Sequence, residues 1–109
     1  MGSGFVPGHL RLLLLHLLAE RPRHGYELIA ELTRRGGQAL EIPEGSVYPA
    51  LHRMERNGLV SSAWQSGSGR RRREYRIEPA GVQELERLRT EWRGFVAAMT
   101  RALEADPDG

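Results

Sequence analysis

Hydrophobic residues recur at helical spacing in four separate stretches of this chain of 109 residues. Residues 10–20 are apolar on almost every side, which predicts a helix that is buried over most of its surface. Apolar residues three and four positions apart predict two further helices, over residues 26–35 and 46–57. A fourth apolar pattern begins at Pro79, a favourable first helical residue, and predicts one long helix that runs to about residue 104.

Glycine, proline and serine mark where the two middle helices begin and end. Gly36 and Gly37 are expected to end the second helix, and Gly58 is expected to end the third. With Ser46 as the N-cap, Pro49 is the third residue of its helix, where no intrahelical amide bond is lost.

Two short stretches between the third and fourth helices predict a β-hairpin. Leu59 to Gln65 alternates loosely between apolar and polar residues, and Arg72 to Ile77 returns with Tyr75 and Ile77 on one face. The segment SGSG between them supplies the turn. The linker before the third helix also leaves room for a short strand at residues 39–42. The expected fold class is therefore mainly α with a small β-hairpin.

The first predicted helix is too short to cross a membrane. Its apolar run spans about ten residues, against roughly 20 for a bilayer, and His16 interrupts it. We therefore expect no membrane partner. The chain has no cysteine, which excludes disulfides and thiolate chemistry and agrees with a cytoplasmic location.

Positive charge is concentrated in one part of the chain. All 16 basic residues are arginines, and the formal net charge is only +2. Residues 1–43 carry a net charge of +1, residues 44–78 carry +3 and residues 79–109 carry −2. The third helix and the hairpin are therefore expected to form the surface that attracts a polyanion.

Four consecutive arginines, Arg70 to Arg73, follow the hairpin turn. Side chains alternate between the two faces of a strand, so four neighbours all reach solvent only where both faces are exposed. At the end of a projecting hairpin, guanidinium groups can contact phosphates on both sides of a groove or enter a narrow minor groove. The alternative is a solvated run that only aids solubility, and the polar face of the neighbouring helix argues against it.

The third helix has an apolar face and a polar face. Val47, Leu51 and Met54 fall on the apolar face, at positions i, i+4 and i+7. Tyr48 is either a contact to DNA or a half-buried aromatic residue, and its place in the first turn favours the contact. The polar face as a whole comprises Ser46, Tyr48, Pro49, His52, Arg53 and Arg56.

Four segments carry a family pattern: HGYELIAEL at 24–32, IPEGSVYPALHRMERNGLV at 42–60, GRRRREYRIEPAG at 69–81 and EWRGFVAAM at 91–99. Through these segments the sequence resembles the PadR family of bacterial winged-helix transcriptional regulators. The resemblance implies a homodimeric DNA-binding protein, usually a repressor, with the third helix in the major groove and the hairpin as the wing. The single helix at the end of the chain is similar to the shorter PadR branch, in which multidrug-responsive members occur.

The resemblance also implies how the chain is divided. Residues 1–8 are expected to be a flexible N-terminus, 9–78 a winged helix-turn-helix domain, 79–105 a dimerisation helix and 106–109 a frayed tail. The expected partner is double-stranded DNA. The residues expected to contact it are Ser46, Tyr48, Pro49, His52, Arg53, Arg56, Arg70, Arg71, Arg72 and Arg73.

The apolar stripe of the final helix favours a dimer over simple core packing. The first helix has more apolar surface than the second and third helices can cover, and a chain this short gains stability by association. The expected interface comprises Leu12, Leu13, Leu85, Leu88, Trp92, Phe95, Val96, Met99 and Leu103. Trp92 and Phe95, paired across a two-fold axis, could line a cavity for a small aromatic effector, as a Trp in the corresponding stretch does in some multidrug-binding relatives. Plain interface packing is the equal alternative.

No catalytic site, metal site or cofactor is expected. His24 and Glu27 lie at the start of the second helix, where a carboxylate suits the positive end of the helix, so this pair does not indicate acid–base catalysis. The four histidines lack i, i+4 pairing with each other, and neither a nucleophile constellation nor a phosphate-binding glycine loop occurs.

These features favour a dimeric repressor that releases its operator when a small aromatic effector enters the dimer interface. Two alternatives stay open. One is a winged-helix module whose polar face binds an acidic protein, and the other is a nucleoid-type DNA binder without an effector. The salt dependence and the sequence preference of DNA binding separate the three.

Overall fold

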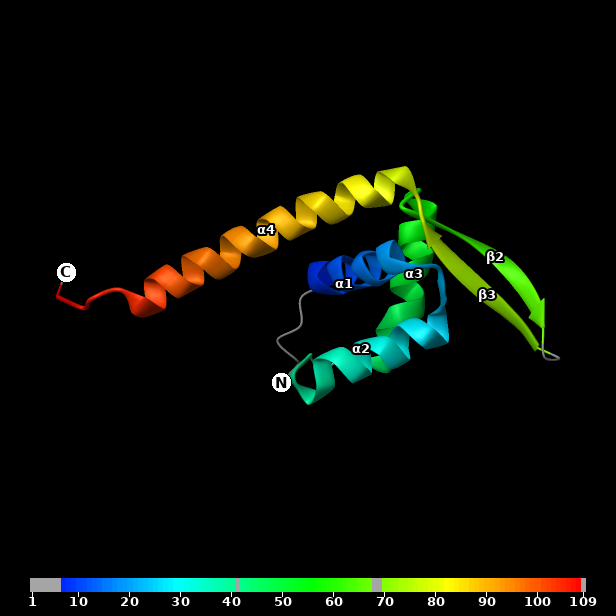
Figure 1. Cartoon of the computed structure of the whole chain (residues 1–109), viewed down its shortest axis with the longest axis horizontal. Coiled ribbons are helices and arrows are strands. Elements are labelled where there is room, and N and C mark those ends of the chain that lie inside the picture. Colours follow the sequence, from blue (N-terminus) through cyan, green and yellow to red (C-terminus); the bar gives the residue numbers. More distant parts are fainter. Residues whose placement is uncertain (1–6, 41, 68–69, 109) are drawn as a thin grey trace.

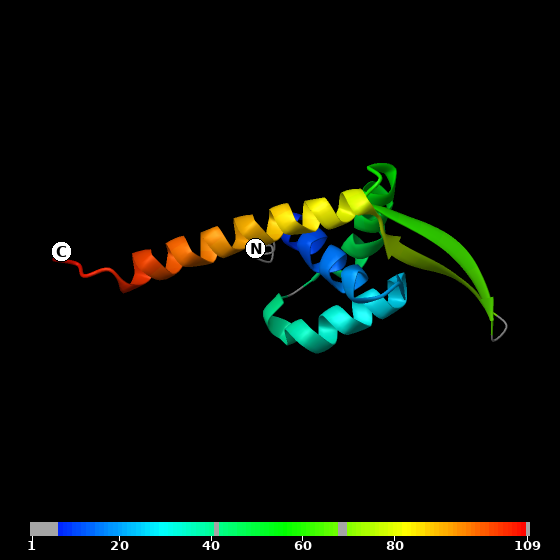
Figure 2. The same ribbon diagram turned by 45° about the horizontal axis from the view of Figure 1, so that its top comes forward.

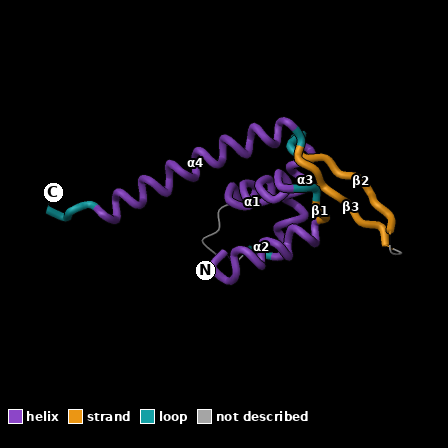
Figure 3. Tube along the Cα trace, viewed as in Figure 1, coloured by secondary structure: helices purple, strands orange, loops and turns teal. Residues whose placement is uncertain are grey.

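The protein is described here from a computed structural model, which covers residues 7–40, 42–67 and 70–108. The chain is mainly helical with one small antiparallel sheet and a long last helix, as the sequence predicts. Three helices pack together, the hairpin projects from one side of them, and the end of the last helix extends past the other (Figures 1 and 3). The elements are α1 (Pro7–Glu20), β1 (Arg23–His24), α2 (Gly25–Leu40), the 3₁₀ turn η1 (Glu44–Ser46), α3 (Val47–Arg56), β2 (Val60–Gly67), β3 (Arg70–Ile77) and α4 (Pro79–Glu104).

The sheet has three antiparallel strands in the order β1-β3-β2. Within the hairpin, pairing runs from Val60 opposite Ile77 to Gly67 opposite Arg70. The strand β1 is not among the elements that the hydrophobic pattern predicts. Two residues are too few to show an alternating pattern, and their partners in β3 lie about fifty positions away in the chain.

The second helix is longer than predicted. It does not end at Gly36 and Gly37 but continues to Leu40, so residues 39 and 40 are helical rather than part of a strand. Glycine inside a helix costs only about 1 kcal/mol relative to alanine, so it weakens a helix without ending it. Glycine ends a helix when its backbone turns left-handed, and among the described glycines only Gly58 has a positive φ, of 76°.

The third helix begins and ends as the sequence indicates, with one difference in the cap. Ser46 occupies the N-cap position, but its hydroxyl donates to the carbonyl of Pro43 at 2.6 Å rather than capping the helix. Pro49 is the third helical residue, as predicted. At the other end, the amide of Leu59 donates to the carbonyl of Met54 at 2.9 Å, and Gly58 adopts the left-handed conformation of a Schellman motif.

The core lies between α1, α3 and the base of the hairpin. The predicted face of α3 is buried, and Tyr75 from β3 is 1 % exposed among leucines of α1 and α2. The buried apolar residues are Leu10, Leu14, Leu15, Leu17, Leu18, Leu28, Leu32, Val47, Ala50, Leu51, Met54, Val60, Tyr75 and Leu85. In both views α4 lies beside α1, and its second half leaves the body of the molecule (Figures 1 and 2).

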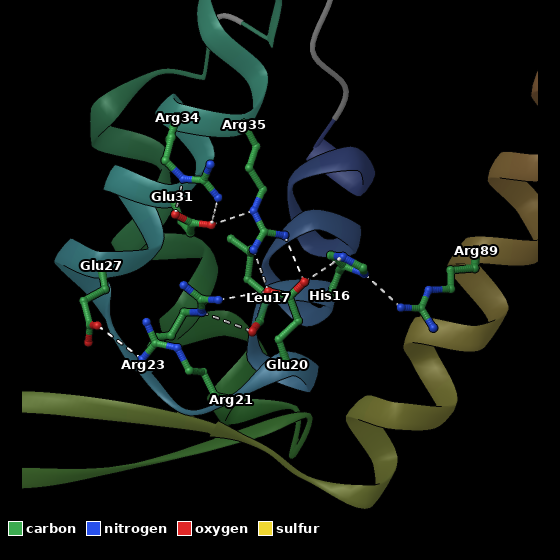
Figure 4. Close-up of polar contacts among 10 residues, drawn as sticks. All are labelled: His16, Leu17, Glu20, Arg21, Arg23, Glu27, Glu31, Arg34, Arg35 and Arg89. Carbon is green, nitrogen blue, oxygen red and sulfur yellow. Dashed lines mark hydrogen bonds and ion pairs between the residues drawn. The ribbon is translucent and has the colours of Figure 1, made fainter.

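A polar network ties the end of α1 to its neighbours (Figure 4). Glu20 accepts hydrogen bonds from Arg35 of α2 at 2.7 and 3.0 Å and from Arg23 of β1 at 2.9 Å. Arg89 of α4 donates to Nδ1 of His16 at 2.8 Å. These contacts hold β1, and with it one edge of the sheet, against the helices.

The ends of the chain differ in part from the expected division. Residues 1–6 of the predicted flexible N-terminus lie outside the described residues, and α1 already begins at Pro7. The last helix ends at Glu104, and residues 106–108 form no further helix. No helix in the described part of the chain is long and apolar enough to span a bilayer.

Candidate nucleic-acid interface

The outer face of α3 presents most of the predicted contact residues to solvent. Tyr48 is 44 % exposed, and Pro49, His52 and Arg56 are also exposed. Ser46 is half-buried and directs its hydroxyl to Pro43. The exposed residues lie opposite the buried face of the helix, as its 3.6-residue period requires.

Tyr48 is held against the start of α2. Its ring lies on Gly25 so closely that a Cβ at that position would stand 2.5 to 3.0 Å from two ring carbons and the hydroxyl oxygen of Tyr48. A glycine here allows an aromatic ring on one helix to rest on the backbone of another, and this contact fixes the direction of the Tyr48 hydroxyl.

The wing arginines belong to the outer half of β3 and alternate between its faces. Arg71 and Arg73 share a face with Trp64, and their guanidinium carbons lie 4.9 and 5.4 Å from the centre of its indole ring. Arg72 lies on the other face, opposite Gln65. The side chain of Arg70 is outside the described part of the chain. Trp64 was not singled out from the sequence, although the strand register places it directly opposite Arg73.

A hollow of about 710 Å³ separates the wing from the helices. It brings Tyr48 and His52 of α3 together with three of the predicted wing arginines. The other lining residues were not predicted to contact DNA. The full lining is His24, Gly25, Tyr26, Tyr48, His52, Trp64, Arg71, Arg72, Arg73 and Tyr75. The hollow therefore combines aromatic surfaces with positive charge, the two features with which proteins hold nucleic acid.

The edge of this hollow near α2 is rigidly built. The carboxylate of Glu27 accepts a hydrogen bond from the backbone amide of His24 at 2.9 Å, the reciprocal half of a capping box, and this bond lowers the Glu27 pKa. Nε2 of His24 lies 3.3 Å from the side-chain oxygen of Gln65 on the wing. Burial raises the pKa of the Tyr75 phenol at the bottom of the hollow.

Arg73 is tied to the body of the protein. Its Nε donates to the hydroxyl of Ser62 at 2.6 Å, and that hydroxyl donates to Oε2 of Glu55 on α3 at 2.7 Å. A second nitrogen of Arg73 lies 3.7 Å from Oε1 of Glu55. No side-chain hydrogen bond or ion pair joins the guanidinium group of Arg71 or Arg72 to a described residue, although both residues pair with β2 through the backbone.

Arg53 does not border this hollow. It lines a separate open groove of about 680 Å³ between α1, α3 and α4. One end of the groove is aromatic. There the ring centre of Trp92 lies 5.3 Å from the ring centre of His9 and 6.0 Å from that of Phe95. The structure thus separates Arg53 from Tyr48 and His52, with which the sequence grouped it.

The residues predicted for a dimer interface fall into two groups. Leu85 is 2 % exposed and belongs to the core of the single chain, and Leu12, Leu13 and Leu88 pack against that core. The residues further along α4 are open to solvent in the single chain. They are Trp92, Phe95, Val96, Met99 and Leu103, between 40 and 79 % exposed.

Comparison with known sequences decides the family. The profile of the transcriptional regulator PadR-like family matches residues 14–87, which contain the second half of α1, all of α2 and α3, the wing and the start of α4. The chain belongs to the PadR family. PadR proteins are DNA-binding transcriptional regulators rather than enzymes, so the polar and basic surface of this PadR chain belongs to a regulator of transcription.

Individual relatives agree with this PadR assignment. The chain is 43 % identical over 81 residues to the transcriptional regulator Rv3488 of Mycobacterium tuberculosis, covering 74 % of this chain and 73 % of the relative. A PadR-like regulator of Bacillus cereus is similar in structure, with a TM-score of 0.78, 28 % identity and coverage of 91 and 95 %. A PadR family regulator of Clostridium difficile gives a TM-score of 0.75 with 31 % identity and coverage of 87 and 98 %.

Proposed function

We propose that this protein is a dimeric transcriptional repressor. Residues 9–78 would bind the operator, and residues 79–105 would carry the dimer contacts. The observation that carries the proposal is the hollow in which the exposed residues of α3 face the arginines of the wing. A helix enters the major groove of B-DNA, which is about 12 Å wide, and a ribbon beside it reaches the flanking backbone.

The two elements would have different tasks. Tyr48, Pro49 and His52 lie on the exposed face of α3 and would contact base edges, with Arg56 close to the backbone. Of the wing, Arg71 and Arg72 have guanidinium groups without a carboxylate partner in the described residues, so they would neutralise phosphates. Ser46 and Arg70 remain candidates for the same surface.

The first experiment isolates genomic fragments that bind the purified protein and compares their affinity with that of random duplexes. A repressor with an operator prefers a small set of fragments. A module for an acidic protein binds no duplex, and a nucleoid-type protein binds all duplexes alike. Repression itself is tested with a reporter gene behind the selected fragment, with and without the regulator.

A second experiment measures the charge contribution of the wing. The double variant R71A/R72A removes two proposed phosphate contacts per protomer, so the slope of log K against log salt for a dimer should flatten by roughly 3.6. The matched control R93A/R101A removes the same charge from exposed positions of α4. Equal flattening in both variants would mean that only the overall charge matters, and the wing would have no special role.

The proposed effector site is the groove between α1, α3 and α4. Its support is the exposed aromatic pair Trp92 and Phe95, together with a volume of about 680 Å³ that suits a small aromatic molecule. Calorimetric titration with naphthol, a compact apolar aromatic probe, should give binding that W92A loses. If W92A binds the probe as the natural chain does, the groove is an interface without a ligand.

A further inference from the structure

Arg71, Arg72 and Arg73 of the wing are not equivalent. The side chain of Arg72 has no hydrogen bond or ion pair with a described residue, and the guanidinium group of Arg71 interacts only with the ring of Trp64. Arg73 touches the same ring and is also linked to Glu55, directly and through Ser62. Its side chain is 40 % exposed and that of Glu55 is 29 % exposed. A guanidinium with these contacts has fewer N–H groups left for a phosphate.

The position of this linkage in the fold is mechanically important. Ser62 pairs with Tyr75, which is fully buried, whereas Trp64 is 56 % exposed. The hairpin therefore leaves the core between the pair Ser62 and Tyr75 and the pair Trp64 and Arg73. Glu55 and Arg73 join the wing to α3 at that point, and no described residue of the wing beyond it is buried.

We propose that Glu55 and Arg73, bridged by Ser62, form a brace that sets the angle between the wing and α3. Arg73 is then a positioning residue for DNA binding and not a phosphate contact. The inference rests on the proposed function in one respect, namely that the wing and α3 bind the same duplex. Apart from its base, the wing is tied to the body by its pairing with β1 and by the contact of His24 with Gln65, and the brace removes freedom that these contacts leave before DNA arrives.

Charge alone makes the opposite prediction for Glu55. A carboxylate close to a phosphate backbone repels it, so removing Glu55 should tighten DNA binding if electrostatics were its only effect. The brace predicts weaker binding in E55A, because the wing must then be ordered at the moment of binding. Arg73 provides a similar contrast. R73K keeps the positive charge but loses the planar fork that spans Ser62 and Glu55, so the brace predicts that R73K behaves like R73A.

The experiment combines two measurements on E55A, R73A, R73K and the control R72A in the full-length protein. Hydrogen exchange of the hairpin amides in the absence of DNA should be faster in the first three variants and unchanged in R72A. Affinity for a selected duplex should fall on the order of tenfold in the same three variants, with no further loss in E55A/R73A. The salt slope should stay unchanged in R73A and flatten in R72A by roughly 1.8 per dimer.

Several outcomes would overturn the brace. Unchanged hairpin exchange in E55A and R73A would show that the linkage does not hold the wing. A flattened salt slope in R73A, with R73K binding normally, would make Arg73 a phosphate contact. Faster hydrogen exchange of the hairpin amides in E55A and R73A, without any loss of affinity for the duplex, would mean that the angle of the wing does not affect DNA binding. If instead the wing does not contact DNA, R72A leaves the salt slope of DNA binding unchanged. Hydrogen exchange of the hairpin then still shows whether the brace holds the wing. The milder variant E55Q, which keeps an acceptor for Ser62, serves if E55A unfolds.

Discussion

Gly81, in the first turn of α4, lies directly against the backbone carbonyl oxygen of Leu59, so closely that a side chain at position 81 would overlap it. The same oxygen accepts a hydrogen bond from the amide of Glu78 at 2.9 Å. The loop that follows α3 and the start of α4 are therefore fixed to each other at this contact. Because α4 carries the proposed dimer surface, the contact also sets the direction of that surface relative to α3.

Replacing Gly81 with alanine should destabilise the fold by about 1–3 kcal/mol, the usual cost of overpacking. The neighbouring oxygen belongs to the backbone and cannot move away without losing its bond to Glu78. Chemical unfolding followed by circular dichroism measures the loss. Gly94→Ala is the matched control, because a Cβ there meets nothing within 4 Å. It should stabilise the helix by about 0.5–1 kcal/mol. Equal effects of the two substitutions would refute the role assigned to Gly81.

The elements that could be predicted from the sequence are those with local signals. The buried face of α3 follows from residues spaced three and four apart, and Gly58 ends that helix as expected. Tyr75 and Ile77 face inward from β3, as their alternation with polar residues predicts. The family pattern was equally visible, because it consists of contiguous segments.

The features that the sequence could not supply depend on residues far apart in the chain. The strand β1 exists because it pairs with Tyr75 and Glu74, and the packing of Tyr48 on Gly25 joins two helices. The division of the polar face of α3, with Arg53 in one hollow and His52 in another, depends on how α4 packs. The helical period places Arg53 and His52 on the polar face of α3 but gives no information on which other elements lie next to each of them.

The contact between Tyr48 and Gly25 leads to a prediction about operator choice. Gly25→Ala should displace the ring, which can swing away at little cost to stability because it is the end of a side chain. If Tyr48 contacts a base, the variant should lose about 1–3 kcal/mol of binding to a selected operator and much less to random DNA. Gel-shift titrations on both duplexes test this. A Tyr48→Ala variant should show the same pattern, and equal losses on both duplexes would reduce Tyr48 to a backbone contact.

Two carboxyl groups between helices predict how stability changes with pH. Hydrogen bonds from Arg35 lower the pKa of Glu20 from 4.5 to about 2. Hydrogen bonds from Arg87 and then Arg11 lower the pKa of Glu84 from 4.5 to about 2. A carboxyl group whose pKa is lower in the folded than in the unfolded chain stabilises the fold at pH values above its unfolded pKa. This stabilisation is lost as the pH falls through its folded pKa. The unfolding temperature should therefore be constant near neutral pH and decline as the pH falls from 4.5 towards 2.

Glu84 allows a direct test, because it joins α4 to Arg11 of α1 at 3.0 Å. E84Q should be less stable than the natural chain at neutral pH by about 1 kcal/mol, since solvent screens part of the interaction. The difference should shrink towards pH 2, where the natural carboxyl group becomes protonated. E86Q removes the same charge from an exposed position of the same helix and is the control. A difference for E84Q that stays constant with pH would contradict the assignment.

The structure sharpens the test of dimerisation. Leu88 packs on the core of the single chain, so changing it would confuse loss of folding with loss of association. Phe95 and Leu103 are 55 and 79 % exposed on α4, and an apolar stripe of this kind is typical of an interface.

The double variant F95E/L103E should therefore remain folded and become monomeric, because association would bury four like charges in each dimer. Light scattering gives the mass, and circular dichroism verifies that the helices persist. V82E changes an exposed apolar residue in the first turns of α4, next to the loop after α3, and should leave the mass of the dimer unchanged. Monomeric F95E/L103E should also lose about half of the salt slope of DNA binding, since one wing instead of two then contacts the duplex. A natural chain that stays monomeric at tens of micromolar would refute the dimer, and the exposed stripe of α4 would need another partner.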